Sequence, residues 1–282
     1  MREFRGRVAV VTGSASGIGR AMATRFAAEG MRLVLADIEE AALAAAVEDF
    51  RAAGAEVVGI RTDVAVAADV DALRDRTLEA FGAVHVVCNN AGVGGSGIVG
   101  APLPVWEWVI GVNLWGVVHG VQTFLPLLLE QNEGHIVNTG SLAGLGGVPG
   151  LGIYCTTKFA VVGLSESLSY DLDALGTEVG VSVLCPGFVQ TQIGESARNA
   201  PSSLAQWTGT ESAQSTREMA NALAAAGIPP ADVAEAVFDA IGAGRFFVLP
   251  HEHAALATTR GRLAWMEGGE APRLDPTRAL QP

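Results

Sequence analysis

The chain has 282 residues and fits one large domain better than two, since single α/β domains of about 200–250 residues are common. Its residues are 49% hydrophobic and 17% charged, which excludes intrinsic disorder because such a chain can bury a sizeable apolar core. The net charge of −12, without any run of lysines or arginines, argues against binding to nucleic acid or to an anionic membrane, since both would repel the chain.

Short apolar runs alternate along the chain with longer alanine-rich segments, a pattern typical of βαβ units. The apolar runs predict strands at residues 8–11, 32–36, 56–61, 84–88, 135–139, 179–185 and 246–249. The segments of helical period predict helices at residues 17–29, 39–53, 67–81, 104–131, 152–175 and 230–242. Residues 193–227 are Ala/Ser-rich and less periodic, and the residues from Pro250 onward predict a short helix and a loose tail.

This order of elements predicts an α/β fold, a Rossmann-type doubly wound parallel sheet of seven strands with helices on both faces. No internal repeat or linker divides the chain, so we expect a single domain over residues 1–250. Within it, residues 190–227 are expected to form a mobile lid over the substrate. Residues 251–282 are expected to form a C-terminal extension.

The cysteines and the apolar runs bear on the compartment. Cys88, Cys155 and Cys185 form no CxxC pair, which favours buried thiols in a reducing compartment over disulfides or metal ligands. The N-terminus lacks an apolar signal core, and the longest apolar run, residues 109–129, is interrupted by polar residues and a proline. We therefore expect a soluble cytoplasmic protein.

The first strand leads directly into a glycine-rich loop, residues 12–19 with the sequence TGSASGIG, and then into a helix. Glycines at positions 13, 17 and 19 leave room for a phosphate to approach the free amides of the helix N-terminus. The spacing differs from the GxGxxG fingerprint, although the mechanics are the same. A plain tight turn is the alternative interpretation.

Asp37 ends the second strand, twenty residues after Gly17. A carboxylate at this point can accept hydrogen bonds from the adenosine ribose hydroxyls and would repel a 2′-phosphate. Since neither Ser16 nor Ile38 is basic, the sequence favours NAD over NADP. Asp37 could instead cap the following helix, and the two roles are compatible.

These residues, with others further along, resemble the short-chain dehydrogenase/reductase family over residues 5–250. The glycine-rich loop, the Asn-Asn-Ala-Gly stretch at residues 89–92, the Asp-Val pair at residues 63–64 and the Pro-Gly pair at residues 186–187 followed by Thr191 match the family's motifs. The resemblance implies that the Asp-Val pair lies against the adenine and that Thr191 meets the nicotinamide carboxamide. The cofactor residues that it implies are Gly13, Ser16, Gly17, Ile18, Gly19, Asp37, Asp63, Val64, Asn90, Ala91, Gly92, Tyr154, Lys158, Pro186, Gly187, Val189 and Thr191.

The family's catalytic set falls on Asn113, Ser141, Tyr154 and Lys158, with Ser141 thirteen residues before Tyr154. Oxidation of a secondary alcohol needs a base for the hydroxyl proton, and an unperturbed tyrosine, with a pKa of about 10, is a poor base at neutral pH. Residues four apart share a helix face, so the Lys158 ammonium and the positive nicotinamide should lower the pKa of Tyr154.

Further roles follow from chemistry and from the resemblance. Ser141 can hydrogen-bond the substrate oxygen. The resemblance implies that Lys158 also grips the nicotinamide ribose and that Asn113 positions a water in a proton relay. Asn113 could instead be a helix-bending residue satisfied by the backbone. Gly140 replaces a serine that is common in the family, which leaves Ser141 as the sole stabiliser expected there.

The residues expected around the reacting carbon carry few charges. Ser141 and Tyr154 should contact the substrate together with Leu142, Val148 and Phe188, which predicts a hydrophobic secondary alcohol or its ketone. Arg198 and Arg217 lie on the lid and leave a carboxylated substrate open. No metal site is expected, because His251 and His253 lack a third ligand nearby.

The helices at residues 104–131 and 152–175 are apolar nearly all round, which predicts a homodimer or homotetramer that packs them pairwise. Two other functions compete with an NAD-dependent dehydrogenase. One is an NADPH-dependent carbonyl or 3-oxoacyl-carrier-protein reductase, which Asp37 disfavours. The other is a non-catalytic NAD-binding regulator, which would have no need of the Ser-Tyr-Lys set.

Overall fold

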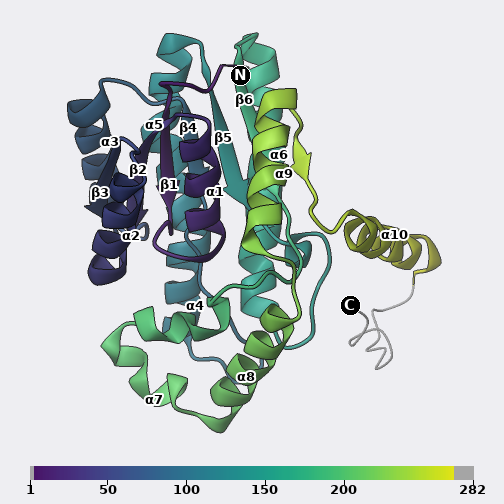
Figure 1. The fold of residues 1–282 in the computed structure, drawn as a ribbon. Coiled ribbons are helices and arrows are strands. Elements are labelled where there is room, and N and C mark those ends of the chain that lie inside the picture. The colour runs from purple at the N-terminus through teal and green to yellow at the C-terminus, as the bar shows by residue number, and fades with distance from the viewer. Residues whose placement is uncertain (1–2, 270–282) are drawn as a thin grey trace.

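The computed structural model describes residues 3–269 (Figure 1). Its strands are β1 (Val8–Thr12), β2 (Arg32–Asp37), β3 (Val57–Arg61), β4 (Val86–Asn89), β5 (Gly134–Thr139), β6 (Val179–Leu184) and β7 (Phe247–Val248). Its α-helices are α1 (Gly17–Ala28), α2 (Glu40–Ala52), α3 (Ala67–Phe81), α4 (Leu103–Ile110), α5 (Gly116–Gln131), α6 (Gly152–Leu175), α7 (Ala205–Thr208), α8 (Glu211–Ala225), α9 (Pro230–Ala243) and α10 (Glu252–Gly268). The predicted strands and the helices that join them are confirmed, with ends shifted by at most two residues.

All seven strands are parallel, in the order β3-β2-β1-β4-β5-β6-β7. The predicted doubly wound sheet is therefore confirmed. The chain runs outward from β1 to β3 and then crosses back to place β4 on the other side of β1. Ligands of such sheets bind beyond the carboxyl ends of the strands at this reversal point.

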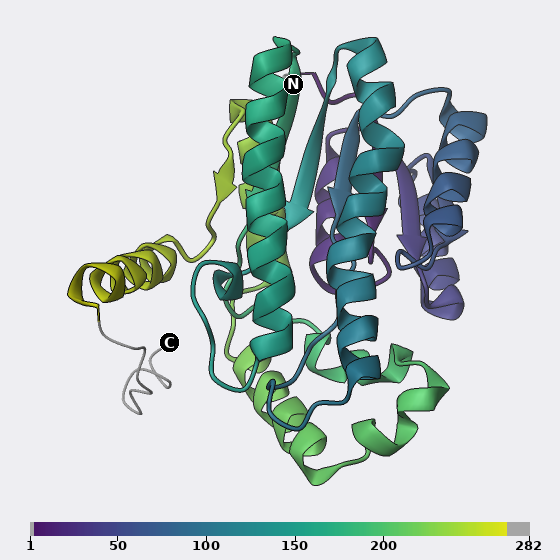
Figure 2. The ribbon, with the colours of Figure 1, turned by 180° about the vertical axis from the view of Figure 1, so that it is seen from behind.

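Helices cover both faces of the sheet. Helices α1, α2 and α9 lie in front of it in Figure 1, and α3, α5 and α6 cover the opposite face in Figure 2. Strand β1 is buried along its whole length, and its residues alternate between the two layers: Ala9 and Val11 face one, Val8 and Val10 the other. A strand buried on both faces reads as the continuous apolar run found in the sequence.

The helix predicted at residues 104–131 is divided. Helix α4 leads into a π-helical turn, Gly111–Trp115, and α5 follows without a break in direction. By length and composition alone, Leu103–Gln131 is long and apolar enough to cross a membrane. In the fold its inner face packs on the sheet, where Phe124 and Leu128 are fully buried.

The end of the chain is more helical than the sequence predicts. Residues 211–225 of the expected irregular lid form α8, because alanine and its neighbours there favour a helix although no broad apolar stripe marks it. Helix α10 spans 17 residues, longer than the short helix expected, and projects from the body (Figures 1 and 2). The rest of the predicted loose tail, residues 270–282, lies outside the described residues.

The three cysteines are free and buried, as the sequence predicts. Cys88 lies in β4 and Cys185 directly after β6, and neither side chain is exposed to solvent. Cys155 lies in the first turns of α6 and is 6% exposed. All three therefore lie toward the edge of the sheet where the candidate site is built.

Candidate active site

The loop between β1 and α1 leaves no space for side chains at two of its glycines. Gly13 has a φ of +64°, which favours glycine, and a Cβ there would lie 2.8 Å from the Cα of Ala91. A Cβ on Gly19 would overlap the carbonyl oxygen of Gly13. Helix α1 begins at Gly17, so its free amides open onto this loop. The glycines at positions 13 and 19 thus make room for the protein's own backbone, and the binding of a dinucleotide phosphate at these amides stays a prediction.

Backbone amides hold the Asp37 carboxylate at the end of β2. Its Oδ2 accepts a hydrogen bond from the Ala15 N–H in the glycine-rich loop (2.9 Å), and its Oδ1 accepts one from the Glu39 N–H (3.0 Å). The second bond fixes the turn that leads into α2, but Asp37 is not the N-cap residue that the alternative supposed, because Glu39 holds that position. The side chain is half-buried, so its carboxylate still borders the groove where ribose hydroxyls would lie.

Thr12 and Asn90 join the ends of the two central strands. The Thr12 Oγ1 accepts hydrogen bonds from the N–H groups of Asn90 (2.9 Å) and Ala91 (3.0 Å), and the Asn90 Nδ2 donates to the Thr12 carbonyl (2.9 Å). The floor of the groove between β1 and β4 is therefore fixed by polar contacts across the reversal point.

Asp63 and Val64 follow β3 on the same edge of the sheet. The Asp63 Oδ1 accepts a hydrogen bond from the Ala65 N–H (3.0 Å), which shapes the turn. Val64 is 7% exposed, and it packs so closely on Gly116 that a Cβ at that position would lie 2.7 Å from it. The pair thus has a fixed position directly after β3, and its expected contact with the adenine stays a prediction.

Ser141, Tyr154 and Lys158 come together at the carboxyl end of β5. Tyr154 lies close enough to Ser141 for the serine to counter part of its pKa shift, and the Ser141 Oγ accepts the Ala143 N–H at 3.1 Å. The Lys158 Nζ donates to the Thr139 carbonyl (2.8 Å) and lies 5.5 Å from the centre of the Tyr154 ring. The structure therefore brings together three of the four residues of the predicted catalytic set.

Burial shifts the pKa values of both ionisable groups. It raises the pKa of Tyr154 to about 12, and Ser141 offsets only part of this effect. It lowers the pKa of Lys158 to about 8, because the ammonium is taken out of water with a single carbonyl as partner. In the protein alone, burial therefore decides the direction of the Tyr154 pKa shift, and the lowering expected from Lys158 together with bound nicotinamide stays a prediction.

Asn113, the fourth predicted residue, lies in the π-helical turn and is fully buried. Its Oδ1 accepts the Val93 N–H (2.8 Å), and its Nδ2 donates to the Val93 carbonyl (3.0 Å). The backbone thus satisfies this side chain, as in the structural alternative. A Cβ on Gly92 would lie 3.4 Å from the Asn113 Oδ1 and 3.8 Å from the Lys158 Nζ, so the amide and the ammonium flank the same glycine.

The expected substrate residues border the same end of the sheet. Val148 and Phe188 are 38% and 48% exposed, and the Val148 N–H donates to the Cys155 thiol next to Tyr154 (3.3 Å). Leu142 packs against Gly187, where a Cβ would lie 3.1 Å from its Cδ1. We call Leu142, Val148 and Phe188 the apolar wall, and their contact with a substrate stays a prediction.

His251 supports this wall from the start of α10. Its Nδ1 accepts a hydrogen bond from the Gly187 N–H (3.0 Å), so its ring holds the Pro-Gly turn. Within residues 3–269, no group of three or more His, Cys, Asp or Glu side chains is arranged to hold a metal ion.

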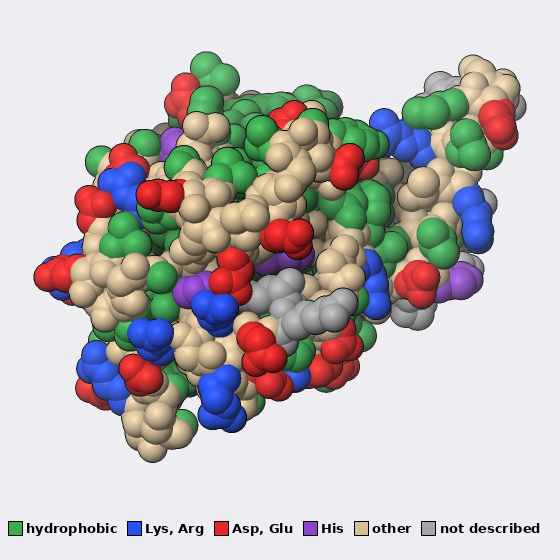
Figure 3. All heavy atoms as spheres, turned by 90° about the horizontal axis from the view of Figure 1, so that it is seen from above, with side chains coloured by type: hydrophobic (Ala, Val, Ile, Leu, Met, Phe, Trp, Pro, Cys, Tyr) green, Lys and Arg blue, Asp and Glu red, His purple; other side chains and the backbone are tan. Residues whose placement is uncertain are grey.

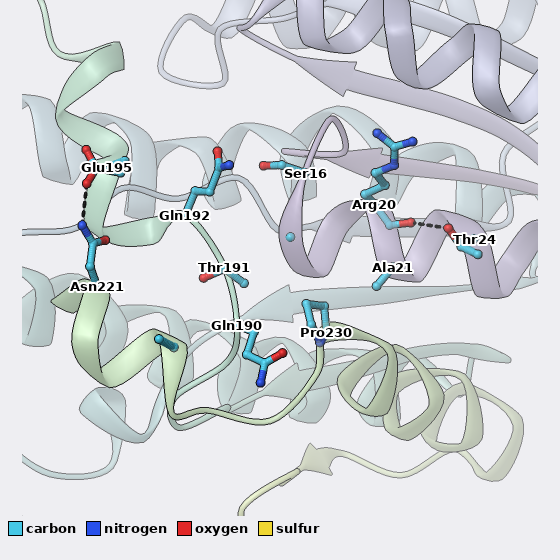
Figure 4. A pocket seen from close by; sticks show the side chains of 12 residues that line it. Ser16, Arg20, Ala21, Thr24, Gln190, Thr191, Gln192, Glu195, Asn221 and Pro230 are labelled. Atoms are coloured by element: carbon cyan, nitrogen blue, oxygen red, sulfur yellow. Dashed lines mark hydrogen bonds between the residues drawn. The ribbon is translucent and has the colours of Figure 1, made fainter.

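The lid segment (residues 190–227) lies against the mouth of the groove. The Ser196 Oγ accepts the Gly94 N–H (2.8 Å), and Thr191 contacts Gly17. A cavity of about 670 Å³ opens between the start of α1 and the lid; its labelled side chains include Ser16, Gln192 and Glu195 (Figure 4). The cavity thus joins the glycine-rich loop to the inner side of the lid.

Sequence reasoning missed two groups of contacts here. The Ser196–Gly94 bond joins residues 102 apart, and the Glu39 carboxylate binds Arg198 and Asn199, 159 and 160 residues along the chain. Arg198 is therefore paired at the end of β2, whereas the sequence left it open as a substrate-carboxylate ligand. No local pattern signals contacts over such separations.

Comparisons with known proteins agree with this geometry. The short chain dehydrogenase family matches residues 7–202. A short-chain dehydrogenase/reductase from Burkholderia phymatum, solved in complex with NAD, is 48% identical, with a TM-score of 0.94 over 98% of this chain and 99% of that one.

Two further proteins are similar along most of the chain. The 1-deoxy-11-beta-hydroxypentalenate dehydrogenase of Streptomyces avermitilis is 38% identical over 87% of this chain and 85% of its own length. An actinorhodin polyketide ketoreductase, solved with NADPH, is 30% identical, with a TM-score of 0.73 over 88% of this chain and 97% of that one. The motifs, the doubly wound sheet and these matches agree: the chain is an oxidoreductase that belongs to the short-chain dehydrogenase/reductase family.

Proposed function

We propose that this oxidoreductase transfers a hydride between NAD(H) and a hydrophobic secondary alcohol or its ketone. The observation that carries the proposal is that Tyr154 and Lys158 lie one turn apart on α6, with the Lys158 Nζ 5.5 Å from the Tyr154 ring and Ser141 near the phenol. An acid–base group next to a dinucleotide cradle is the arrangement that hydride transfer with proton transfer requires.

Each group of the site has a role in this proposal. The glycine-rich loop, Asp37, the Asn90–Gly92 turn and the Pro186–Thr191 segment would hold the dinucleotide. When bound, the cofactor accepts or supplies the hydride.

Tyr154 takes the proton from the substrate hydroxyl in oxidation and returns it in reduction, while Ser141 hydrogen-bonds the same oxygen. The Lys158 ammonium favours the phenolate form of Tyr154 and grips the nicotinamide ribose. Asn113 positions the loop at Val93 that borders the site, and the predicted water relay through it remains part of the proposal.

Asp37 supports NAD as the cofactor. Its carboxylate is held in place by two amides and would repel a 2′-phosphate. The similarity to a ketoreductase solved with NADPH favours the alternative, an NADPH-dependent carbonyl or 3-oxoacyl-carrier-protein reductase. Measuring turnover with both cofactors side by side distinguishes the two.

The apolar wall of Leu142, Val148 and Phe188 supports a hydrophobic substrate. Pairing of Arg198 with Glu39 further weakens the case for a carboxylated one, since this guanidinium already has an anionic partner. A panel of cyclic, aromatic and steroid-like alcohols with NAD, followed by the absorbance of reduced nicotinamide, identifies the substrate class.

Replacing Tyr154 by phenylalanine tests the proposed function. We expect turnover to fall by about 10²-fold or more, the scale of general acid–base catalysis, while NAD binding persists. Tyr170, the other tyrosine of the chain, is 76% exposed on the same helix, so Tyr170→Phe is the matched control and should keep full turnover. A wild-type protein that binds NAD but turns over none of the panel would support the regulator instead.

A further inference from the structure

The carboxylate of Glu39 holds the lid at the adenosine end of the groove. Its Oε1 accepts hydrogen bonds from the Arg198 Nε (2.9 Å) and the Asn199 Nδ2 (2.9 Å), and it lies 2.6 Å from a terminal guanidinium nitrogen of Arg198. Both donors come from the 3-10 helix Ile193–Asn199 of the lid segment. About a third of each paired side chain is exposed. The pair lowers the pKa of Glu39, so this carboxylate stays ionised at neutral pH.

This pair lies next to Asp37, whose carboxylate binds the ribose in the proposed function. The inference rests on that proposed function. Glu39 is two residues after Asp37, and its own N–H donates to the Asp37 Oδ1 (3.0 Å). The fold therefore carries the Arg198 guanidinium to the end of β2. A 2′-phosphate on the adenosine ribose would be placed at this same end of the groove.

A guanidinium at this point is the group that a 2′-phosphate needs, because arginine binds phosphate through charge-assisted hydrogen bonds. Other guanidinium groups around this edge are also paired: Arg20 with Asp49 (2.5 Å) and Arg61 with Asp69 (3.5 Å). In the described structure, each of these arginines thus has a carboxylate partner. For Arg198 the anionic partner is Glu39, the residue whose N–H binds Asp37.

We infer that Glu39 is a cofactor-specificity residue. Because it pairs with Arg198, that guanidinium is not free to bind the 2′-phosphate of NADP. Asp37 repels the 2′-phosphate directly. Glu39 prevents the Arg198 guanidinium from offsetting this repulsion by binding the phosphate. The pair also fastens the lid. That fastening alone would affect NAD and NADP alike, whereas a specificity role changes their ratio.

Four variants measure this ratio by binding, without turnover. Glu39→Gln keeps the shape and one oxygen acceptor but frees the guanidinium charge, and Arg198→Gln removes the cation. The double variant carries both changes. Glu40→Gln is the matched control, because Glu40 is the next residue, exposed, and makes no contact with Arg198 in the described structure. Dissociation constants of NAD⁺ and NADP⁺ are measured by titration calorimetry, with circular dichroism to verify folding.

We divide the dissociation constant of NAD⁺ by that of NADP⁺. We expect Glu39→Gln to raise this ratio about tenfold, the scale of one charge-assisted contact, because NADP⁺ then binds more tightly. Glu40→Gln should leave the ratio unchanged, and the double variant should return it to the wild-type value. An unchanged ratio in Glu39→Gln, or a gain that survives in the double variant, overturns the inference. A wild-type protein that binds neither dinucleotide contradicts the proposed function instead.

Discussion

Burial acts in opposite directions on the two ionisable side chains of α6. It raises the pKa of Tyr154 to about 12 and lowers that of Lys158 to about 8, so at about pH 7 Tyr154 is a neutral phenol while Lys158 keeps its ammonium. Both shifts follow from loss of hydration, which penalises a phenolate and an ammonium equally. The phenol is therefore held protonated until a positive group is bound close to it.

A spectrophotometric titration tests this effect. Tyr154 should ionise near pH 12, which gives a step of phenolate absorbance in this upper range. Tyr154→Phe should remove the upper step, and NAD⁺ should shift that step to lower pH. A titration in which Tyr154→Phe removes no step near pH 12 contradicts the burial argument.

The raised pKa of Tyr154 also makes the free energy of unfolding depend on pH. The folded state keeps the Tyr154 proton between about pH 10 and 12, where the unfolded state has lost it. This contribution to the free energy of unfolding is therefore complete below about pH 10 and is lost as the pH rises through that window.

At the scale of the element, the π-helical turn Gly111–Trp115 decides where Asn113 points. The wider turn interrupts the run between α4 and α5 and directs a buried amide to both polar groups of Val93. Such turns often occur at functional sites, because they re-aim a side chain without ending the helix. The loop at Val93 is thereby fixed next to Gly92, the glycine that lies close to the Lys158 ammonium.

Replacing Asn113 by alanine should destabilise the protein. The change leaves the buried N–H and C=O of Val93 unpaired, at a cost of about 1–3 kcal/mol in the free energy of unfolding. Urea denaturation measures it. Gln122→Ala, at an exposed position of α5, is the control and should stay within about 0.5 kcal/mol of wild type. Equal stability of the two variants would mean that Asn113 does not hold the loop.

How much the sequence predicts depends on the range of the interactions concerned. Strand β1 and the glycine-rich loop are local patterns, so their positions and their roles in the fold were predictable. The π-helical turn was not, because its residues are as apolar as the helix around it. The pairing of Glu39 with Arg198 was also hidden, since it depends on where the lid returns in space. The raised Tyr154 pKa follows from burial, which spacing alone does not give.

At the scale of the whole molecule, charge and apolar surface have different consequences. Acidic and basic side chains alternate over the face seen in Figure 3, without a continuous basic area. Apolar side chains are exposed on α10, where Leu263 and Met266 are 52% and 67% exposed. The predicted absence of nucleic-acid partners remains a prediction that this charge distribution favours.

The helices that cover one face of the sheet also expose large apolar side chains. Trp115 is 52% exposed and Tyr170 76%, on the run α4–α5 and on α6, which supports the predicted homodimer or homotetramer. Light scattering should give a multiple of the chain mass of 29.0 kDa. Trp115→Glu combined with Tyr170→Glu should shift the protein toward the monomer, because it places charge in the proposed interface. A monomeric wild type at micromolar concentration contradicts the prediction.

The rates at which the three buried thiols react with an alkylating reagent would also report how the protein opens. Burial raises the pKa values of Cys88, Cys155 and Cys185, so an alkylating reagent reacts only when the surrounding structure parts. Cys88 in the central sheet would be labelled on global unfolding, whereas Cys155 would also be labelled when only the first turns of α6 fray. The ratio of the two labelling rates would separate breathing of the catalytic helix from loss of the whole fold.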